Sequence, residues 1–312
     1  MIEEIRRARD VIAGVAIRTP LVRLDVDADA EIWLKLELLQ PVRSFKIRGA
    51  ANAILQATDA ELASGVFTAS AGNMAQGVCV AARIRGVPAT IVVPEHAPQA
   101  KLDAIARYGG RVIKVAYDEW WNTMITGSYE GLDGMFVHPV DNRRVMAGNG
   151  TIGLELLEQL DDFDAVVVPW GGGGLFTGIA SALAAERPAV QMWVAEPDTA
   201  APVTASRAAG APVEVEYSPS FVDGSGARAL IPGVWQRAEH FVDGSVALSL
   251  EATAAALRLV VARARVVPEG AGALPVAAAL SGRIDAKKIV CIVSGGNIDT
   301  SVLARILEGE TP

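Results

Sequence analysis

The chain has 312 residues, enough for about two domains with buried cores. It is 51% hydrophobic and 21% charged, as is common in globular enzymes, and its formal net charge is −8. This acidic balance argues against binding to nucleic acid or to an anionic membrane surface, because both need clusters of basic residues.

The N-terminal residues 1–14 have the pattern of a charged amphipathic helix and lack the apolar core of a signal peptide. No apolar stretch reaches the ~18 residues that a membrane span needs. The two cysteines, Cys79 and Cys291, lie in apolar runs and predict buried free thiols, not a disulfide framework. We therefore expect a protein of the reducing cytoplasm.

Short apolar runs alternate with helical patterns along most of the chain. This alternation is typical of βαβ units and predicts an α/β protein with a parallel sheet. The predicted strands are 31–38, 65–70, 89–94, 111–116, 165–170, 191–196 and 288–294. The predicted helices between them are 48–58, 75–86, 98–108, 150–160, 175–186, 250–265 and 271–281. Residues 217–235 form the one long irregular connection.

The stretch "PVRSFKIRGA" (41–50) places Lys46 directly after Phe45 at the start of a helical pattern. Three interpretations stay open at this point: a solvated surface charge, a phosphate contact, or a desolvated amine that does covalent chemistry. We interpret Arg43 and Arg48 as solvated charges beside it.

Three predicted strands end in turns of small residues that lead into helices, at 66–77, 166–178 and 291–301. In open parallel sheets, ligands bind at the carboxyl ends of the strands. Free backbone N–H groups and the helix dipole make such turns suitable for anions. The three turns together therefore indicate a binding site.

The turn "GGGGL" (171–175) gives the strongest evidence for a binding site among the three, because four glycines without Cβ atoms let the backbone close around a phosphate. A tight structural turn is the alternative. The Gly-Lys-Ser/Thr ending of the Walker phosphate-binding motif is absent. The glycine spacing of the dinucleotide-binding motif is not met either, because Phe176 or Thr177 stands where the third glycine is needed. Glu196 ends the next predicted strand, where an acid that binds the ribose of a dinucleotide would stand, so a dinucleotide ligand stays an alternative. A smaller phosphate ligand fits the turn better.

The other two turns carry polar side chains. In "SAGN" (70–73), Ser70 and Asn73 are suited to hold a carboxylate, and in "SGGN" (294–297) Ser294 is suited to meet a heterocycle nitrogen. Plain helix capping is the alternative for both. The three histidines are not spaced as metal ligands, and we interpret Trp120 and Trp121 as packing residues.

With "SFKIRGA", "SAGNMAQG", "GGGGL" and "SGGNID" in this order, nearly the whole chain resembles the fold-type II pyridoxal-phosphate enzymes of the threonine dehydratase (threonine ammonia-lyase) and serine racemase family. The resemblance implies a tryptophan synthase β-like fold of two domains, with parallel-rich twisted sheets flanked by helices. It implies a large cofactor domain of residues 1–49 and 146–312, a small mobile substrate domain of residues 50–145, and a homodimer.

The resemblance also implies roles for single residues. Lys46 would bind the cofactor aldehyde covalently and then act as base on the substrate Cα–H, and Phe45 would pack beside the cofactor. Asn73 would donate a hydrogen bond to the ring hydroxyl, and Ser294 would meet the pyridine nitrogen. The phosphate would be held by the backbone of Gly171, Gly172, Gly173, Gly174 and Leu175. The substrate would be bound by Ser70, Ala71, Gly72, Asn73 and Met74.

The chain departs from the family pattern in four places, of which Asn149 in "AGNGT" (147–151) has no clear consequence. Ala71 stands where racemases carry a second serine, so racemisation should be weak. Met74 replaces the usual histidine and suggests a larger, less polar pocket. The usual metal-binding glutamate is not evident near "YSPSFVDG", so we expect no metal site, with Asp223 as a weak candidate.

The expected activity is dehydration and deamination of a β-hydroxy-α-amino acid, L-threonine or L-serine by default, to a 2-oxo acid and ammonia. Alternatives are the same reaction on L-threo-phenylserine or 3-hydroxyaspartate, serine racemisation, or β-replacement. A non-catalytic protein that binds a phosphate ligand through "GGGGL" also stays open.

Overall fold

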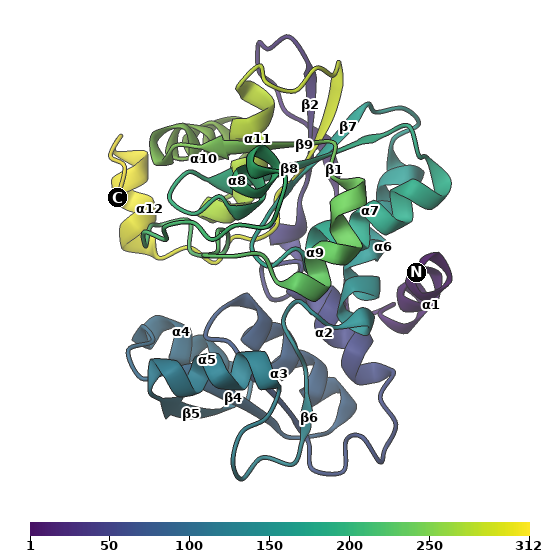
Figure 1. The fold of residues 1–312 in the computed structure, drawn as a ribbon, viewed down its shortest axis with the longest axis vertical. Helices are drawn as coiled ribbons and strands as arrows, with labels where there is room; N and C mark the ends of the chain where they lie inside the picture. The colour runs from purple at the N-terminus through teal and green to yellow at the C-terminus, as the bar shows by residue number, and fades with distance from the viewer.

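Two β-sheets organise the computed structural model, which describes all 312 residues (Figure 1). The larger sheet has six strands in the order β1-β2-β10-β7-β8-β9, and the smaller has four in the order β5-β4-β3-β6. The larger sheet comprises β1 (Leu21–Arg23), β2 (Glu31–Lys35), β7 (Ala165–Pro169), β8 (Gln191–Pro197), β9 (Gly244–Leu248) and β10 (Lys288–Ile292). The smaller comprises β3 (Val66–Ala69), β4 (Ala89–Pro94), β5 (Arg111–Val115) and β6 (Met135–Phe136).

Every strand pair in both sheets is parallel except β1 with β2. The α/β prediction is therefore confirmed, and all seven predicted strands are present. The sequence pattern missed β1 and β6, which have three and two residues and are too short to show a period. It also missed β9, whose first two residues are glycine and serine.

Twelve α-helices connect and cover these strands. They are α1 (Ile2–Val11), α2 (Lys46–Leu55), α3 (Asn73–Arg85), α4 (Gln99–Arg107), α5 (Tyr117–Thr126), α6 (Arg143–Gln159), α7 (Gly174–Glu186), α8 (Pro202–Ala209), α9 (Pro232–Ala238), α10 (Leu250–Ala264), α11 (Gly270–Leu280) and α12 (Thr300–Leu307). Helices α5, α8, α9 and α12 were not predicted, and α9 occupies the end of the long connection 217–235. Helix α6 begins earlier than expected, because the Asn142 side chain caps it by accepting a hydrogen bond from the Val145 N–H.

The six-stranded sheet is buried on both faces. Along β10, Ile289 and Cys291 belong to the core that includes α10 and α11, whereas Val290 and Ile292 belong to the core that includes α7. Alternate residues of a strand point to opposite faces, so this strand is apolar at every position. No helix in the structure combines the length and the apolar character that crossing a bilayer requires.

The two sheets form the upper and lower halves of the molecule in Figure 1, and α2 and α6 lie between them. These helices approach closely, because a Cβ on Gly148 would lie 2.4 Å from the carbonyl oxygen of Arg48. The expected domain limits, residues 49/50 and 145/146, fall inside α2 and α6, and this division stays a prediction.

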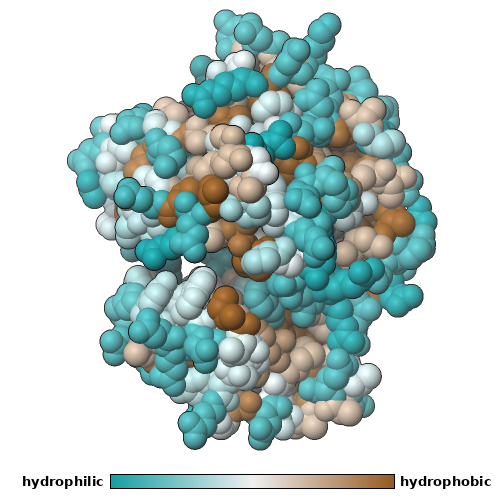
Figure 2. All heavy atoms as spheres, viewed as in Figure 1, coloured by the Kyte–Doolittle hydropathy of each residue, from teal (hydrophilic) through white to brown (hydrophobic).

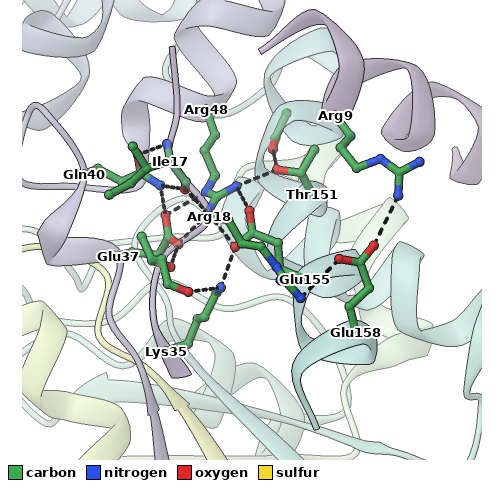
Figure 3. Close-up of polar contacts among 12 residues, drawn as sticks. Arg9, Ile17, Arg18, Lys35, Glu37, Gln40, Arg48, Thr151, Glu155 and Glu158 are labelled. Carbon is green, nitrogen blue, oxygen red and sulfur yellow. Dashed lines mark hydrogen bonds and ion pairs between the residues drawn. The ribbon is translucent and has the colours of Figure 1, made fainter. Parts of the chain in front are cut away.

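A buried ionic cluster joins α2 and α6 to β2 (Figure 3). We use this name for Lys35, Glu37, Arg48 and Glu155. The Arg48 guanidinium donates to both Glu37 oxygens at 2.7 and 2.8 Å, and to both Glu155 oxygens at 2.6 and 2.9 Å. Lys35 donates to Glu155 and to the carbonyl oxygen of Thr19.

The interpretation of Arg48 as a solvated charge was wrong, since only 1% of this residue is exposed. Burial alone would lower the pKa of Arg48 and raise that of Glu37, but their mutual contact reverses both shifts. Two cations therefore neutralise two anions in the interior. Arg43 is exposed, as expected, and has a left-handed φ of 59°.

Candidate active site

A cavity of about 450 Å³ lies between the two halves of the molecule. In the space-filling view, the surface is hollowed between the halves (Figure 2). The three predicted turns and the start of α2 all contribute to its wall. Every predicted site residue lines it: Phe45, Lys46, Ser70, Ala71, Gly72, Asn73, Met74, Gly171, Gly172, Gly173, Gly174, Leu175, Asp223 and Ser294.

A second hollow, of about 530 Å³, lies over α10 and α11. Its lining is mainly alanine and leucine, and Arg283 is its one charged residue. Since it holds no acid or nucleophile beyond two serines, the first cavity is the candidate active site.

Lys46 is the first residue of α2 and faces the cavity from its start. Its Nζ donates a hydrogen bond of 3.0 Å to the carbonyl oxygen of Pro139, and it lies 5.0 Å from the ring centroid of Phe45. Burial lowers the pKa of Lys46 to about 8, although the nearby Glu269 favours the charged amine. A desolvated amine of this kind is available for nucleophilic and base chemistry near neutral pH.

Close contacts with neighbouring side chains leave the glycine turn no room for side chains of its own. A Cβ on Gly172 would lie 2.6 Å from Val140, and one on Gly173 would lie 2.6 Å from the Trp170 ring. Gly173 also has a left-handed φ of 89°. The turn therefore lines the cavity with backbone alone, and no side chain caps the N-terminus of α7 that follows.

The segment Ser70–Met74 joins β3 to α3 on the other side of the cavity. The Ser70 hydroxyl accepts a hydrogen bond from the Gly72 N–H at 3.2 Å. Ala71 brings only a methyl group to the lining. Met74 is 1% exposed and packs into the core of the smaller sheet, so it adds an apolar edge to the cavity.

Asn73 is part of a polar network that crosses between the halves. Its Nδ2 donates to both carboxylate oxygens of Glu269, at 3.0 and 3.1 Å, and its Oδ1 accepts from Asn297 Nδ2 at 2.7 Å. The amide group of Asn73 is thus already engaged within the protein. Its expected hydrogen bond to a cofactor hydroxyl stays a prediction.

Glu269 is the main site residue that the sequence reasoning missed. It lines the cavity, is 5% exposed, and immediately precedes α11. Burial raises the pKa of Glu269 to about 7, against the lowering effect of the hydrogen bonds from Asn73. A Cβ on Gly295 would lie 2.5 Å from the Glu269 carboxylate, so the glycines of "SGGN" make room for this acid. The proximity is visible only in three dimensions, since the two segments are far apart in the chain.

Ser294 begins the turn that follows β10 and is 2% exposed. Its carbonyl oxygen accepts a hydrogen bond from the Phe45 N–H, which places the turn beside the start of α2. Its side chain borders the same cavity as Lys46. The position is compatible with the role expected for this hydroxyl, which stays a prediction.

Asp223, the weak candidate for a metal ligand, forms an ion pair of 2.5 Å with Lys101. The chain contains no group of three or more histidine, cysteine, aspartate and glutamate side chains arranged to hold a metal ion. The pair instead links α4 of the lower half to the long connection of the upper half across the cavity.

Glu196 does not face the cavity, and the role of ribose ligand is not open to it. Its carboxylate accepts hydrogen bonds from the N–H groups of Val203 and Thr204 at 2.9 Å, at the start of α8. Burial raises the pKa of Glu196 to about 7. The remaining argument for a dinucleotide is therefore removed.

Comparison with known proteins gives a consistent result. The family model described as "Pyridoxal-phosphate dependent enzyme" matches residues 12–295. The chain is 39% identical over 313 residues to an L-threonine ammonia-lyase of Thermotoga maritima, covering 98% of this chain and 78% of that protein. It is 37% identical over 317 residues to an L-threonine dehydratase catabolic TdcB of Staphylococcus aureus, covering 98% and 91%. Among solved structures, maize serine racemase has a TM-score of 0.90 at 33% identity, covering 98% of this chain and 96% of that one.

Proposed function

The chain belongs to the family of pyridoxal-phosphate dependent enzymes, and on this premise we propose that it dehydrates and deaminates a β-hydroxy-α-amino acid, with L-threonine or L-serine as substrate. The products are a 2-oxo acid and ammonia. The observation that carries the proposal is the desolvated amine of Lys46, which shares one cavity with the uncapped N-terminus of α7 and the polar turn Ser70–Asn73.

The residues of the cavity fit pyridoxal phosphate. A cradle formed by Gly171–Gly174 has no room for side chains at Gly172 and Gly173, and it offers backbone N–H groups and the positive end of the α7 dipole to a phosphate. Lys46 supplies the primary amine that holds the cofactor aldehyde, and Phe45 lies beside it. When bound, the cofactor supplies a carbonyl carbon that joins amino groups and a conjugated ring that accepts electrons from Cα.

Lys46 moves the proton at the substrate Cα. Burial makes its amine neutral at a pH at which an ordinary lysine is charged, so Nζ accepts the Cα–H proton as the hydroxyl leaves Cβ. The resulting enamine takes up water after release and yields the 2-oxo acid and ammonia. Elimination releases one water molecule and hydrolysis of the enamine consumes one. The net reaction therefore converts the substrate into the 2-oxo acid and ammonia.

The turn Ser70–Asn73 orients the substrate. The N-terminus of α3 offers N–H groups to the α-carboxylate, and Ser70 adds a hydroxyl at the same edge. Asn73 would join them by exchanging its hydrogen bonds to Glu269 for one to the ligand. Ser294 lines the same cavity, and its neutral hydroxyl would be the partner of the cofactor ring nitrogen. A neutral partner leaves the ring uncharged and favours rapid elimination over chemistry that needs a long-lived carbanion.

Racemisation is the second candidate, since the chain resembles maize serine racemase closely. Ala71 argues against it, because a methyl group cannot deliver a proton to the face of Cα opposite Lys46. We place elimination first for this reason.

We also propose that the protein acts as a homodimer in the cytoplasm. Both cysteines are buried free thiols, so neither forms a disulfide that would require an oxidising compartment. Analytical ultracentrifugation tests the oligomeric state.

The proposed function is tested by loading the protein with pyridoxal phosphate and measuring release of 2-oxo acid and ammonia from L-threonine and L-serine. We expect equal amounts of both products. Chiral chromatography of the remaining serine should show little D-serine. Absence of both products with every hydroxy amino acid would contradict the proposal, and D-serine as the main product would favour racemisation.

The pH dependence of Lys46 offers a test that needs no turnover. In the cofactor-free protein, only the neutral amine reacts with acetic anhydride, so labelling of Lys46 should rise with pH and reach half its maximum near pH 8. At pH 7 about a tenth of the Lys46 amines should be neutral. Peptide mass spectrometry between pH 6 and 10 measures this midpoint. A midpoint near 10.4, the ordinary lysine value, would show that the cavity does not desolvate the amine.

A further inference from the structure

One wall of the active-site cavity is aromatic and apolar. It is formed by His96, Tyr117, Trp120 and Met124, and we call it the aromatic wall. Three of these residues come from α5, at positions 117, 120 and 124, which share one face of a helix with 3.6 residues per turn. Helix α5 was not predicted from the sequence, and the wall appears only once this helix is placed.

The rings of the aromatic wall support one another. The ring centroids of His96 and Tyr117 lie 6.3 Å apart with an interplanar angle of 26°, and those of Tyr117 and Trp120 lie 5.5 Å apart at 45°. Trp120 and Trp121 are adjacent in the chain, and their ring centroids lie 6.1 Å apart, but they differ in what they line. Trp120 lines the cavity, whereas Trp121 is 50% exposed and does not line it. The interpretation of both tryptophans as packing residues is therefore too simple.

A further aromatic side chain lines the cavity from the other half of the molecule. Tyr217, in the long connection of the upper half, lines the same cavity and is 43% exposed. Tyr117 in the lower half is 53% exposed. Exposed aromatic rings that gather at one cavity indicate a ligand-binding surface, in contrast to rings scattered singly over a protein. The arrangement suits a planar or apolar group held between the halves.

The charges of the cavity oppose an acidic side chain on the substrate. Lys101 is already paired with Asp223, so it is not free to bind a second carboxylate. Asp223 lines the cavity and would repel one, and so would Glu269 in its ionised form. A substrate such as 3-hydroxyaspartate therefore fits this site poorly, whereas a neutral side chain meets no such repulsion.

From this geometry we propose that the enzyme selects β-hydroxy-α-amino acids whose β-substituent is an aromatic ring, and that the aromatic wall and Tyr217 are the residues that select it. This rests on the proposed function, since it names the substrate class for the same reaction. Contact between aromatic rings stabilises a bound aryl substituent, whereas the methyl group of threonine can place only one carbon against the same surface. The apolar edge provided by Met74 fits the same class.

The test compares kcat/KM for L-threo-phenylserine, L-threonine and 3-hydroxyaspartate with the holoenzyme. We expect kcat/KM for phenylserine to exceed that for threonine by about tenfold or more. A single methylene group in an apolar pocket already produces discrimination of this size. Trp120→Ala should lower the ratio of phenylserine to threonine by about tenfold, and Trp120→Phe should keep most of it. The matched control Trp121→Ala removes the neighbouring ring, which packs on Trp120 from outside the cavity, and should leave the ratio of phenylserine to threonine within about twofold of the parent.

A binding measurement keeps the proposal testable without turnover. L-phenylalanine and L-alanine lack the β-hydroxyl, so calorimetry with the holoenzyme compares their Kd directly. Phenylalanine should bind more tightly, and Trp120→Ala should remove the difference. Equal Kd values, or a phenylserine ratio that Trp120→Ala leaves unchanged, would overturn the selection of aromatic substrates while turnover of threonine still supports the proposed function. Loss of turnover with all three hydroxy amino acids would instead defeat the proposed function itself.

Discussion

Replacing Lys46 with alanine is expected to lower turnover of L-threonine by at least about a thousandfold, because in the proposed function this one residue is both the covalent attachment and the base. The bound chromophore should be lost as well, since no other amine of the cavity is free. Lys101, the other lysine in the lining, is held by Asp223. Steady-state assays and absorbance spectra of the purified variant measure the two effects together.

The control for this variant is Lys114→Ala, which removes an exposed lysine of β5 that is not part of the cavity. It should retain full turnover and colour. If Lys46→Ala retained turnover above one hundredth of the parent, the role given to Lys46 would be wrong. If it lost turnover but kept the chromophore, Lys46 would act as a base without being the attachment point.

Replacing Arg48 with methionine is expected to lower the free energy of unfolding by about 3–5 kcal/mol. The guanidinium donates to both Glu37 and Glu155, and without it two carboxylates face each other in the interior with only Lys35 to balance them. Methionine nearly conserves the volume, so the loss should reflect the unpaired charges and not a cavity. Urea unfolding at a fixed cofactor concentration measures the change.

Arg305→Met is the matched control, because Arg305 forms an ion pair with Glu310 in which both side chains are about half exposed. Exposed pairs contribute roughly 0–1 kcal/mol, so this variant should change stability by less than about 1 kcal/mol. Equal effects for the two variants would mean that the buried ionic cluster contributes no more than a surface pair.

The position of Arg48 links stability to the active site. It lies two residues after Lys46 in α2, and the cluster fixes this helix against β2 and α6. The start of α2 is fixed a second time by the hydrogen bond from the Phe45 N–H to Ser294. The lysine is therefore placed by contacts on both sides, as positioning for catalysis requires.

The sequence predicted the parallel architecture and the cavity lining well, for physical reasons. Buried parallel strands such as β7 and β10 are apolar at every position, which makes them easy to find. The glycine turn is recognisable because bare backbone at a helix start has few other uses. Since the carboxyl ends of parallel strands meet at one edge, the residues of the turns could be expected together without knowledge of the packing.

Features that depend on long-range packing could not be predicted in this way. Arg48 has the same local pattern as an exposed residue, and only the approach of Glu37 and Glu155 from other elements explains its burial. Glu269 joins the site only because Asn73 and Gly295 lie beside it in space. Trp120 could not be separated from Trp121 before α5 was placed against the cavity.

The most direct test of the account is reduction of the holoenzyme with borohydride, followed by peptide mapping. The account predicts one modified peptide, with the reduced cofactor on Lys46 at a stoichiometry near one per chain. It also predicts that prior addition of L-threonine, which competes for the cofactor, lowers this label. A label on Lys101 or on any other lysine, or no label at all, would contradict the assignment of Lys46 and with it the proposed site.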